Sequence, residues 1–133
     1  KLILTPHPGE ASKLLDISID DIQSNRPESA KKIAKKYDAD VILKGSETII
    51  YSKEDSALFR CSDGGPELST GGTGDVLAGI ISALVAQNLS NIDACILSVA
   101  VHARAGKIFR EEIGEVGLNA SSLIPIARKI LNQ

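Results

Sequence analysis

The chain has 133 residues, of which 43% are hydrophobic, 24% charged and 3% aromatic, and its formal net charge is −2. These values are typical of one globular domain and argue against a disordered chain. The balance of charges and the shortage of aromatic side chains argue against a nucleic-acid partner, and no apolar run reaches the roughly 20 residues that span a bilayer.

The first sixty residues predict a strand, a helical segment and three further strands. Apolar runs closed by Pro or Gly indicate strands, and aliphatic residues spaced by three or four indicate helices. Because a helical crossover separates the first two buried strands, we expect them to be parallel in an α/β sheet, with a hairpin toward its edge. The expected elements are strands at residues 2–4, 41–44, 48–51 and 57–60, and helices at 8–15, from Ser18 onward and at 27–37.

The second half predicts a loop followed by three helices. Residues 61–72 are rich in Gly, Ser and Pro and predict the loop. The helix at 75–87 is almost wholly apolar, so we expect it to be buried on most sides. A helix at 91–112 and one at 121–130, capped by Ser121, complete the chain. Few strands for so many helices, and a start inside an apolar strand without any Met, suggest a piece of a longer protein.

The run Ser69-Thr70-Gly71-Gly72-Thr73-Gly74-Asp75 predicts an anion-binding helix start. Glycines let the backbone approach a ligand, and a helix start offers unpaired N–H groups and the positive end of the dipole. A carboxylate in the first turn, here Asp75, can accept a proton from a hydroxyl that attacks a phosphate. The simpler alternative is a glycine turn in which Asp75 only caps the helix. The run is not a Walker A loop, because no Gly-Lys-Ser or Gly-Lys-Thr is present.

Two further segments follow predicted strands, where open α/β sheets place their ligands. Prolines on both sides fix His7 in a loop before a helix, and this His either contacts a ligand or only bonds within the loop. Lys44 ends an apolar run, and its side chain either reaches a phosphate or extends along apolar surface into water.

The remaining residues of interest have simpler explanations. His102 lies on an apolar helix face and is expected to be structural. The basic run at residues 31–36 reads as a solvated helix face. Cys61 and Cys95 lack metal-ligand spacing, so free thiols in the reducing cytoplasm are expected.

Taken together, these segments resemble the ADP/ATP-dependent NAD(P)H-hydrate dehydratase family of the ribokinase-like superfamily. The Thr-Pro-His-Pro-Gly-Glu segment separates this family from sugar kinases, which share mainly Gly-Thr-Gly-Asp. The resemblance implies the C-terminal portion of a single ribokinase-like domain over residues 1–133, a three-layer α/β/α sandwich whose sheet is mostly parallel with an edge hairpin. The segments that carry it are Leu4–Glu10, Val41–Gly45, Leu68–Leu77 and Gly117–Ala120.

The resemblance also implies a reaction and its residues. ADP or ATP phosphorylates the ring hydroxyl of hydrated NADH or NADPH, and phosphate then leaves to restore the double bond; Mg²⁺ is expected with the nucleotide. Asp75 would be the catalytic base and would contact the substrate, as would His7. The backbone at Gly72, Thr73 and Gly74 would hold the transferring phosphoryl group. The expected nucleotide-binding residues are Lys44, Gly45, Ser46, Glu47, Thr48 and Gly74.

The pattern departs from the family ahead of the glycine run. This chain has Gly64-Gly65-Pro66-Glu67 where the family usually has Asn-Gly or Asn-Pro-Gly, and Glu67 would add negative charge near the phosphate. Two alternatives stay open, a ribokinase-like small-molecule kinase for hydroxyethylthiazole or a sugar, and a nucleotide-binding half-domain inactive by itself. Expected partners are the NAD(P)H hydrate and the adenine nucleotide, with a homo-oligomer or association with an absent N-terminal half. Neither a nucleic acid nor a membrane is expected.

Overall fold

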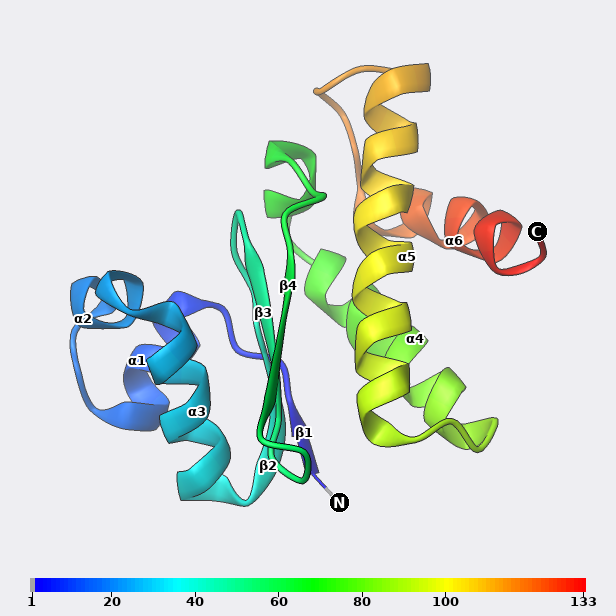
Figure 1. The fold of residues 1–133 in the computed structure, drawn as a ribbon. Helices are drawn as coiled ribbons and strands as arrows, with labels where there is room; N and C mark the ends of the chain where they lie inside the picture. The colour runs from blue at the N-terminus through cyan, green and yellow to red at the C-terminus, as the bar shows by residue number, and fades with distance from the viewer. Residues whose placement is uncertain (1) are drawn as a thin grey trace. The chain divides into compact units, whose positions relative to one another are not determined.

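The computed structural model describes residues 2–133, which divide into two compact units, the first ending at Arg60 and the second running from Cys61 to Gln133. The first unit contains the strands and three helices (Figure 1). Its elements are β1 (Leu2–Leu4), α1 (Pro8–Leu15), α2 (Ile19–Ser24), α3 (Arg26–Tyr37), β2 (Ala39–Leu43), β3 (Thr48–Ser52) and β4 (Ala57–Cys61), of which the last residue already belongs to the second unit.

The four strands form one sheet in the order β1-β2-β3-β4. β1 and β2 run parallel, with Leu2 opposite Ala39 and Leu4 opposite Val41. β2 and β3 are antiparallel, with Ile42 opposite Ile50. The predicted parallel pair and the turn back through a hairpin are therefore confirmed, and the carboxyl ends of β1 and β2 lie at the same edge of the sheet.

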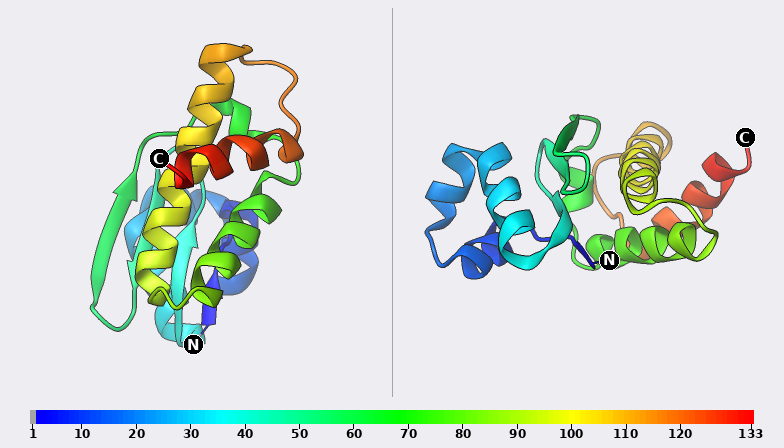
Figure 2. Two further views of the ribbon diagram at one scale, coloured as in Figure 1. Left: turned by 90° about the vertical axis from the view of Figure 1, so that its right-hand side faces the viewer. Right: turned by 60° about the horizontal axis from the view of Figure 1, so that its bottom comes forward.

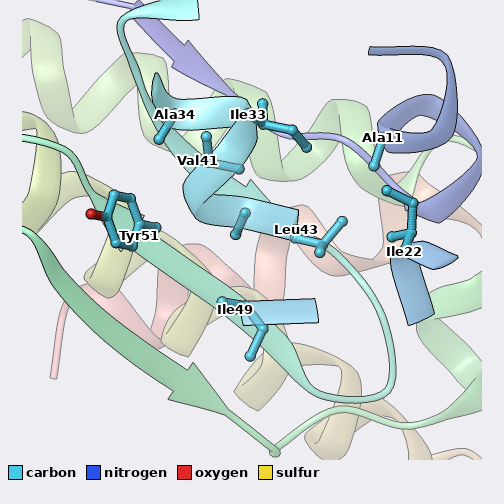
Figure 3. Packing of buried hydrophobic residues seen from close by; sticks show 9 residues of the cluster. Ala11, Ile22, Ile33, Ala34, Val41, Leu43, Ile49 and Tyr51 are labelled. Atoms are coloured by element: carbon cyan, nitrogen blue, oxygen red, sulfur yellow. The ribbon is translucent and has the colours of Figure 1, made fainter. Parts of the chain in front are cut away.

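A hydrophobic core, largely aliphatic, joins the helices of this unit to the sheet (Figure 3). α3 presents Ala30, Ile33 and Ala34 to β2 and β3, and all three are fully buried. The lysines of the same helix are exposed, which confirms the solvated basic face. The buried cluster comprises Ala11, Ile22, Ala30, Ile33, Ala34, Val41, Leu43, Ile49 and Tyr51.

The second unit is helical (Figure 2). α5 is its long central element, and both α4 and α6 pack against it. Their shared core is made by Val101, Ala105, Phe109, Leu118, Leu123 and Ala127. Its elements are the short 3-10 helix η1 (Pro66–Ser69), α4 (Thr73–Ala86), α5 (Asn91–Glu112), η2 (Ala120–Ser122) and α6 (Leu123–Leu131).

Three expectations for the second unit are wrong in detail. Residues 66–69 form η1 rather than a plain loop. α4 buries one stripe, of which Leu77, Ile81 and Leu84 are members, and its small residues tolerate exposure on the other faces at little cost. Asn119, not Ser121, caps the C-terminal helical segment, because its side chain accepts the amide of Ser122 at 3.3 Å. Among residues 2–133, no helix is both long and apolar enough to cross a membrane.

Candidate functional site

The start of α4 carries the predicted anion site. Gly72 is the N-cap residue and has φ +89°, a left-handed conformation that glycine adopts without steric cost. No side chain among the described residues caps this helix start. The amides of the first turn therefore meet no side-chain acceptor, although the Thr73 amide donates to the Thr70 carbonyl at 3.3 Å. The positive end of the helix dipole lies at this turn.

Asp75 lies in the first turn of α4, where the sequence predicted a catalytic carboxylate. Its side chain is exposed. Within the described part of the chain, the Asp75 carboxylate has no hydrogen-bond or ion-pair partner, and it does not cap the helix. The simpler alternative, in which Asp75 serves only as a cap, is therefore wrong.

Buried hydrogen bonds hold this helix start from behind. The Thr73 hydroxyl is shared between the carbonyls of Leu68 at 2.7 Å and Thr70 at 2.8 Å. His102 Nε2, on α5, lies 2.9 Å from the Thr73 carbonyl, and since a carbonyl only accepts, Nε2 carries the proton of this bond. The prediction that His102 is structural agrees with this contact, which sequence reasoning did not anticipate. Thr73 and His102 thus fix the backbone on which the glycine run turns.

Glu67, ahead of the glycine run, is buried and paired. Its side chain is fully buried, accepts the Gly65 amide at 3.0 Å and lies 3.4 Å from the Arg110 guanidinium. The negative charge that the sequence predicted here is therefore paired with a cation. A buried carboxylate needs a partner, and Arg110 of α5 supplies it. The pair ties η1 to the long helix ahead of the glycine run.

His7 begins α1 in the first unit. Its Nδ1 accepts the amides of Gly9 at 3.0 Å and Glu10 at 3.2 Å, while the Glu10 carboxylate accepts the His7 amide at 2.8 Å. This reciprocal arrangement is a capping box with a histidine in place of the usual Ser or Thr. Because Nδ1 is an acceptor, Nε2 is the ring atom that can carry a proton, and it lies 3.5 Å from Glu10 Oε1 on the exposed side of the helix start.

Lys44 lies beside the same helix start. Its amide donates to the Pro6 carbonyl at 2.9 Å, which joins the ends of the two parallel strands. Its ammonium group lies 3.9 Å from Glu10 Oε2. The structure therefore brings His7, Glu10 and Lys44 together at the carboxyl edge of β1 and β2, the edge where α/β sheets place ligands.

Arg26 organises the loop that carries the other predicted nucleotide contacts. Its Nη2 lies within 3.2 Å of the carbonyls of Leu43, Lys44 and Glu47. Partial burial of the guanidinium lowers the pKa of Arg26, and the nearby Glu47 carboxylate partly opposes that effect. Glu47 itself is paired with Arg60 at 2.7 Å. Sequence reasoning missed Arg26, because an arginine at a helix start reads as a solvated charge.

No group of three or more His, Cys, Asp or Glu side chains within residues 2–133 could hold a metal ion. Mg²⁺ nevertheless needs few protein ligands, since it keeps several waters and binds through one or two carboxylates and the phosphates of its substrate. An exposed carboxylate at Asp75, beside an uncapped helix start, fits that mode of binding.

A family model described as NAD(P)H-hydrate dehydratase matches residues 1–129. The chain belongs to the NAD(P)H-hydrate dehydratase family. Its relatives include the bifunctional NAD(P)H-hydrate repair enzyme Nnr of Coxiella burnetii, which is 45% identical over 130 residues, 98% of this chain and 26% of that protein. This dehydratase-family chain thus spans about a quarter of the length of that curated relative.

Solved structures agree with this assignment. The ADP/ATP-dependent NAD(P)H-hydrate dehydratase from Bacillus subtilis, co-crystallised with ATP/Mg²⁺, superposes with a TM-score of 0.91 at 29% identity, over 98% of this chain and 47% of that one. A ribokinase-like superfamily protein from Enterococcus faecalis V583 superposes with a TM-score of 0.80 at 26% identity, over 99% of this chain and 44% of that one. The ribokinase-like fold class predicted from the sequence is therefore confirmed.

Proposed function

We propose that this chain contributes the phosphoryl-transfer machinery of an enzyme that dehydrates hydrated NADH or NADPH, using ADP or ATP. The observation that carries the proposal is the start of α4, where an uncapped glycine turn stands next to the exposed Asp75 carboxylate. Membership of the dehydratase family supports the choice of substrate. The Bacillus subtilis dehydratase, which was co-crystallised with ATP/Mg²⁺, supports the choice of donor.

The proposed reaction has two steps. The Asp75 carboxylate accepts the proton of the ring hydroxyl as that oxygen attacks the terminal phosphorus of the nucleotide, and the bond from phosphorus to the bridging oxygen breaks. The carbon–oxygen bond of the phosphorylated ring then breaks, phosphate leaves, and loss of a proton from the neighbouring ring carbon restores the double bond. The net result is NAD(P)H, phosphate and a nucleotide shortened by one phosphate.

The backbone of Gly72, Thr73 and Gly74 is proposed to hold the transferring phosphoryl group. Amides fixed in advance at a helix start stabilise the charge of the transition state without reorganising, which is the largest contribution in many such reactions. Mg²⁺ bound to the phosphate oxygens of the nucleotide would add to this stabilisation by neutralising phosphate charge. In the first unit, residues 44–48 are proposed to contact the nucleotide, together with Gly74, and His7 the hydrated ring.

The test is a coupled assay on the full-length protein. Hydrated NADH or NADPH is incubated with Mg²⁺ and either ADP or ATP, and the return of the NAD(P)H absorbance is followed with the release of phosphate. The proposal predicts one phosphate released for each NAD(P)H restored. A stable phosphorylated product from an alcohol, with no restored absorbance, would contradict it and favour a small-molecule kinase. Nucleotide binding without any turnover would favour a binding module.

The cytoplasm is the proposed compartment, in keeping with Cys61 and Cys95, which are both free thiols. Self-association, or assembly with another half of a longer domain, stays a prediction. Light scattering of the purified protein across a range of concentrations tests it: a mass that stays at that of one chain would contradict self-association.

A further inference from the structure

Arg26 occupies a position that local preferences disfavour. It is the first residue of α3, where the positive end of the helix dipole repels a cation. Its guanidinium is partly buried, and its Nε is buried without a hydrogen-bond partner among residues 2–133. A residue that is unfavourable for local structure is expected to make a compensating interaction elsewhere in the fold.

That role lies in the loop between β2 and β3. Arg26 Nη2 donates toward the carbonyls of Leu43 at 3.1 Å, Lys44 at 3.2 Å and Glu47 at 2.8 Å. The two N–H groups of Nη2 are thus shared among three carbonyls from both ends of the loop. The guanidinium thereby holds the two ends of the loop together. The other amino group, Nη1, donates to Gln23 Oε1 at 2.6 Å and fixes the plane of the guanidinium.

Gly45 leaves the space that this contact needs. A Cβ atom at Gly45 would lie 2.6 Å from Arg26 Nη2 and 2.9 Å from Cζ. The reason for glycine at this position is therefore close approach, not an unusual backbone angle. Any larger residue must displace the guanidinium from its three carbonyls.

We propose that Arg26 is a positioning residue that holds the Lys44–Glu47 segment in the conformation that binds the adenine nucleotide. The inference rests on the proposed function, which assigns residues 44–48 to that nucleotide. The ammonium group of Lys44 lies 3.9 Å from Glu10 Oε2. The bond to the Lys44 carbonyl also fixes the backbone at the start of the loop. A fork of donors does this better than a point charge, because only the guanidinium reaches several carbonyls at once.

The experiment compares four variants of the full-length protein. Arg26→Met keeps an unbranched apolar stem and removes the donors, Arg26→Lys keeps the charge but not the fork, and Gly45→Ala displaces the guanidinium from the other side. Tyr37→Phe is the matched control, because it removes a 2.9 Å bond from the same helix to the Leu14 carbonyl, away from the loop. The readouts are Mg-ADP and Mg-ATP affinity by calorimetry, amide hydrogen exchange of residues 45–48, and Tm.

Arg26→Met and Gly45→Ala are both expected to weaken nucleotide affinity by about tenfold, the scale of a small displacement of binding groups. Exchange at residues 45–48 should speed up, and Arg26→Lys should recover only part of the affinity. Tyr37→Phe should lower Tm and leave affinity and loop exchange unchanged. Unchanged affinity in both Arg26→Met and Gly45→Ala, with only Tm lowered, would overturn the inference.

Lys44→Ala separates this failure from that of the proposed function. If Lys44→Ala weakens nucleotide binding and Arg26→Met does not, only the positioning role of Arg26 is wrong. If Lys44→Ala, Arg26→Met and Gly45→Ala all leave the affinity unchanged, the loop is not the nucleotide site, and both the assignment of residues 44–48 and the role of Arg26 fail. After that result, the glycine run alone would remain as the proposed nucleotide site.

Discussion

The helices α1 and α4 both begin after loops rich in Pro or Gly, yet their first turns differ in what the chain itself supplies. At α1, His7 Nδ1 accepts two backbone amides, and Glu10 closes the capping box in return. At α4, the N-cap is Gly72, which has no side chain to offer. Side chains therefore satisfy the first helix start, whereas the second has no side-chain acceptor. At the second, the Thr73 amide donates to the Thr70 carbonyl at 3.3 Å, and the amides of Gly72 and Gly74 have no acceptor among the described residues.

The other helices make α4 stand out further. Ser18, Asn25 and Ser90 cap α2, α3 and α5 with side-chain oxygens. α6 has no side-chain cap of its own among the described residues, but it continues from η2, which Asn119 caps. Capping is thus the rule in this chain. A helix start without it, next to an exposed carboxylate, marks the place where an anion would complete the structure.

The largest effect is expected from Asp75→Asn. Removal of the general base should lower turnover by about 100- to 10,000-fold. Tm should change little, because the carboxylate is exposed and has no partner to lose within residues 2–133. Turnover is measured by the coupled assay and Tm by calorimetry.

The matched control is Asp93→Asn, which removes a first-turn carboxylate from α5, a helix that Ser90 caps. Its turnover should stay close to that of the wild type. Turnover near the wild-type value in Asp75→Asn would show that the assignment of the base is wrong.

Next in size is Thr73→Val, which removes the hydroxyl bonded to the carbonyls of Leu68 and Thr70. Loss of these part-buried hydrogen bonds should cost about 0.5–1.5 kcal/mol of the free energy of unfolding for each bond. Nucleotide binding should weaken as well, because the backbone of the helix start loosens. Thr73→Ser keeps the hydroxyl and should recover most of both losses. A wild-type-like Thr73→Val together with a destabilised Thr73→Ser would mean that the methyl group, not the hydroxyl, supports the turn.

Two variants of His7 test whether its side chain caps α1, contacts the substrate, or does both. His7→Ala should cost about 1 kcal/mol of unfolding free energy, because α1 loses its cap, whereas Asn is a good N-cap and His7→Asn should cost much less. If His7 contacts the hydrated ring, both variants should raise the KM for that substrate. A raised KM in His7→Ala alone would mean that His7 acts only through the cap.

The smallest effect is expected from Glu10→Gln. A glutamine still completes a capping box, and the lost attraction to Lys44 is long and half exposed, so the free energy of unfolding should change by less than about 0.5 kcal/mol. Urea unfolding measures it. A loss several times larger would show that the charges at the start of α1 are not screened by water.

Much of this architecture could be predicted from the sequence, because its signals are local. The strands, the helix starts at Pro8 and Ser18 and the glycine turn at Gly72 all follow from short patterns. What could not be predicted depends on distant partners. The sequence predicted Glu67 only as an added negative charge, and its burial and its pairing with Arg110, on α5, could not be read from it. The prediction that α4 is buried on most sides failed for a similar reason, because the apolar content of a helix does not say which of its faces are covered.

The candidate site shows the same limit. The motifs named Asp75 and the residues of the glycine run, but not what holds them. The contact of His102 with the Thr73 carbonyl joins residues far apart in the chain, and no short motif encodes it. Arg26 was missed for the same reason, since its meaning appears only when its guanidinium is seen among the carbonyls of the β2–β3 loop.

The contrast between the two helix starts can be measured directly by NMR on the isotope-labelled full-length protein. A non-hydrolysable ATP analogue with Mg²⁺ is added, and the backbone amides at the starts of α1 and α4 are followed. Our account predicts large shifts and slower exchange at Gly72, Thr73 and Gly74, with little change at Gly9 and Glu10, whose amides His7 already accepts. A nucleotide that binds without perturbing the amides of residues 72–74 would contradict it.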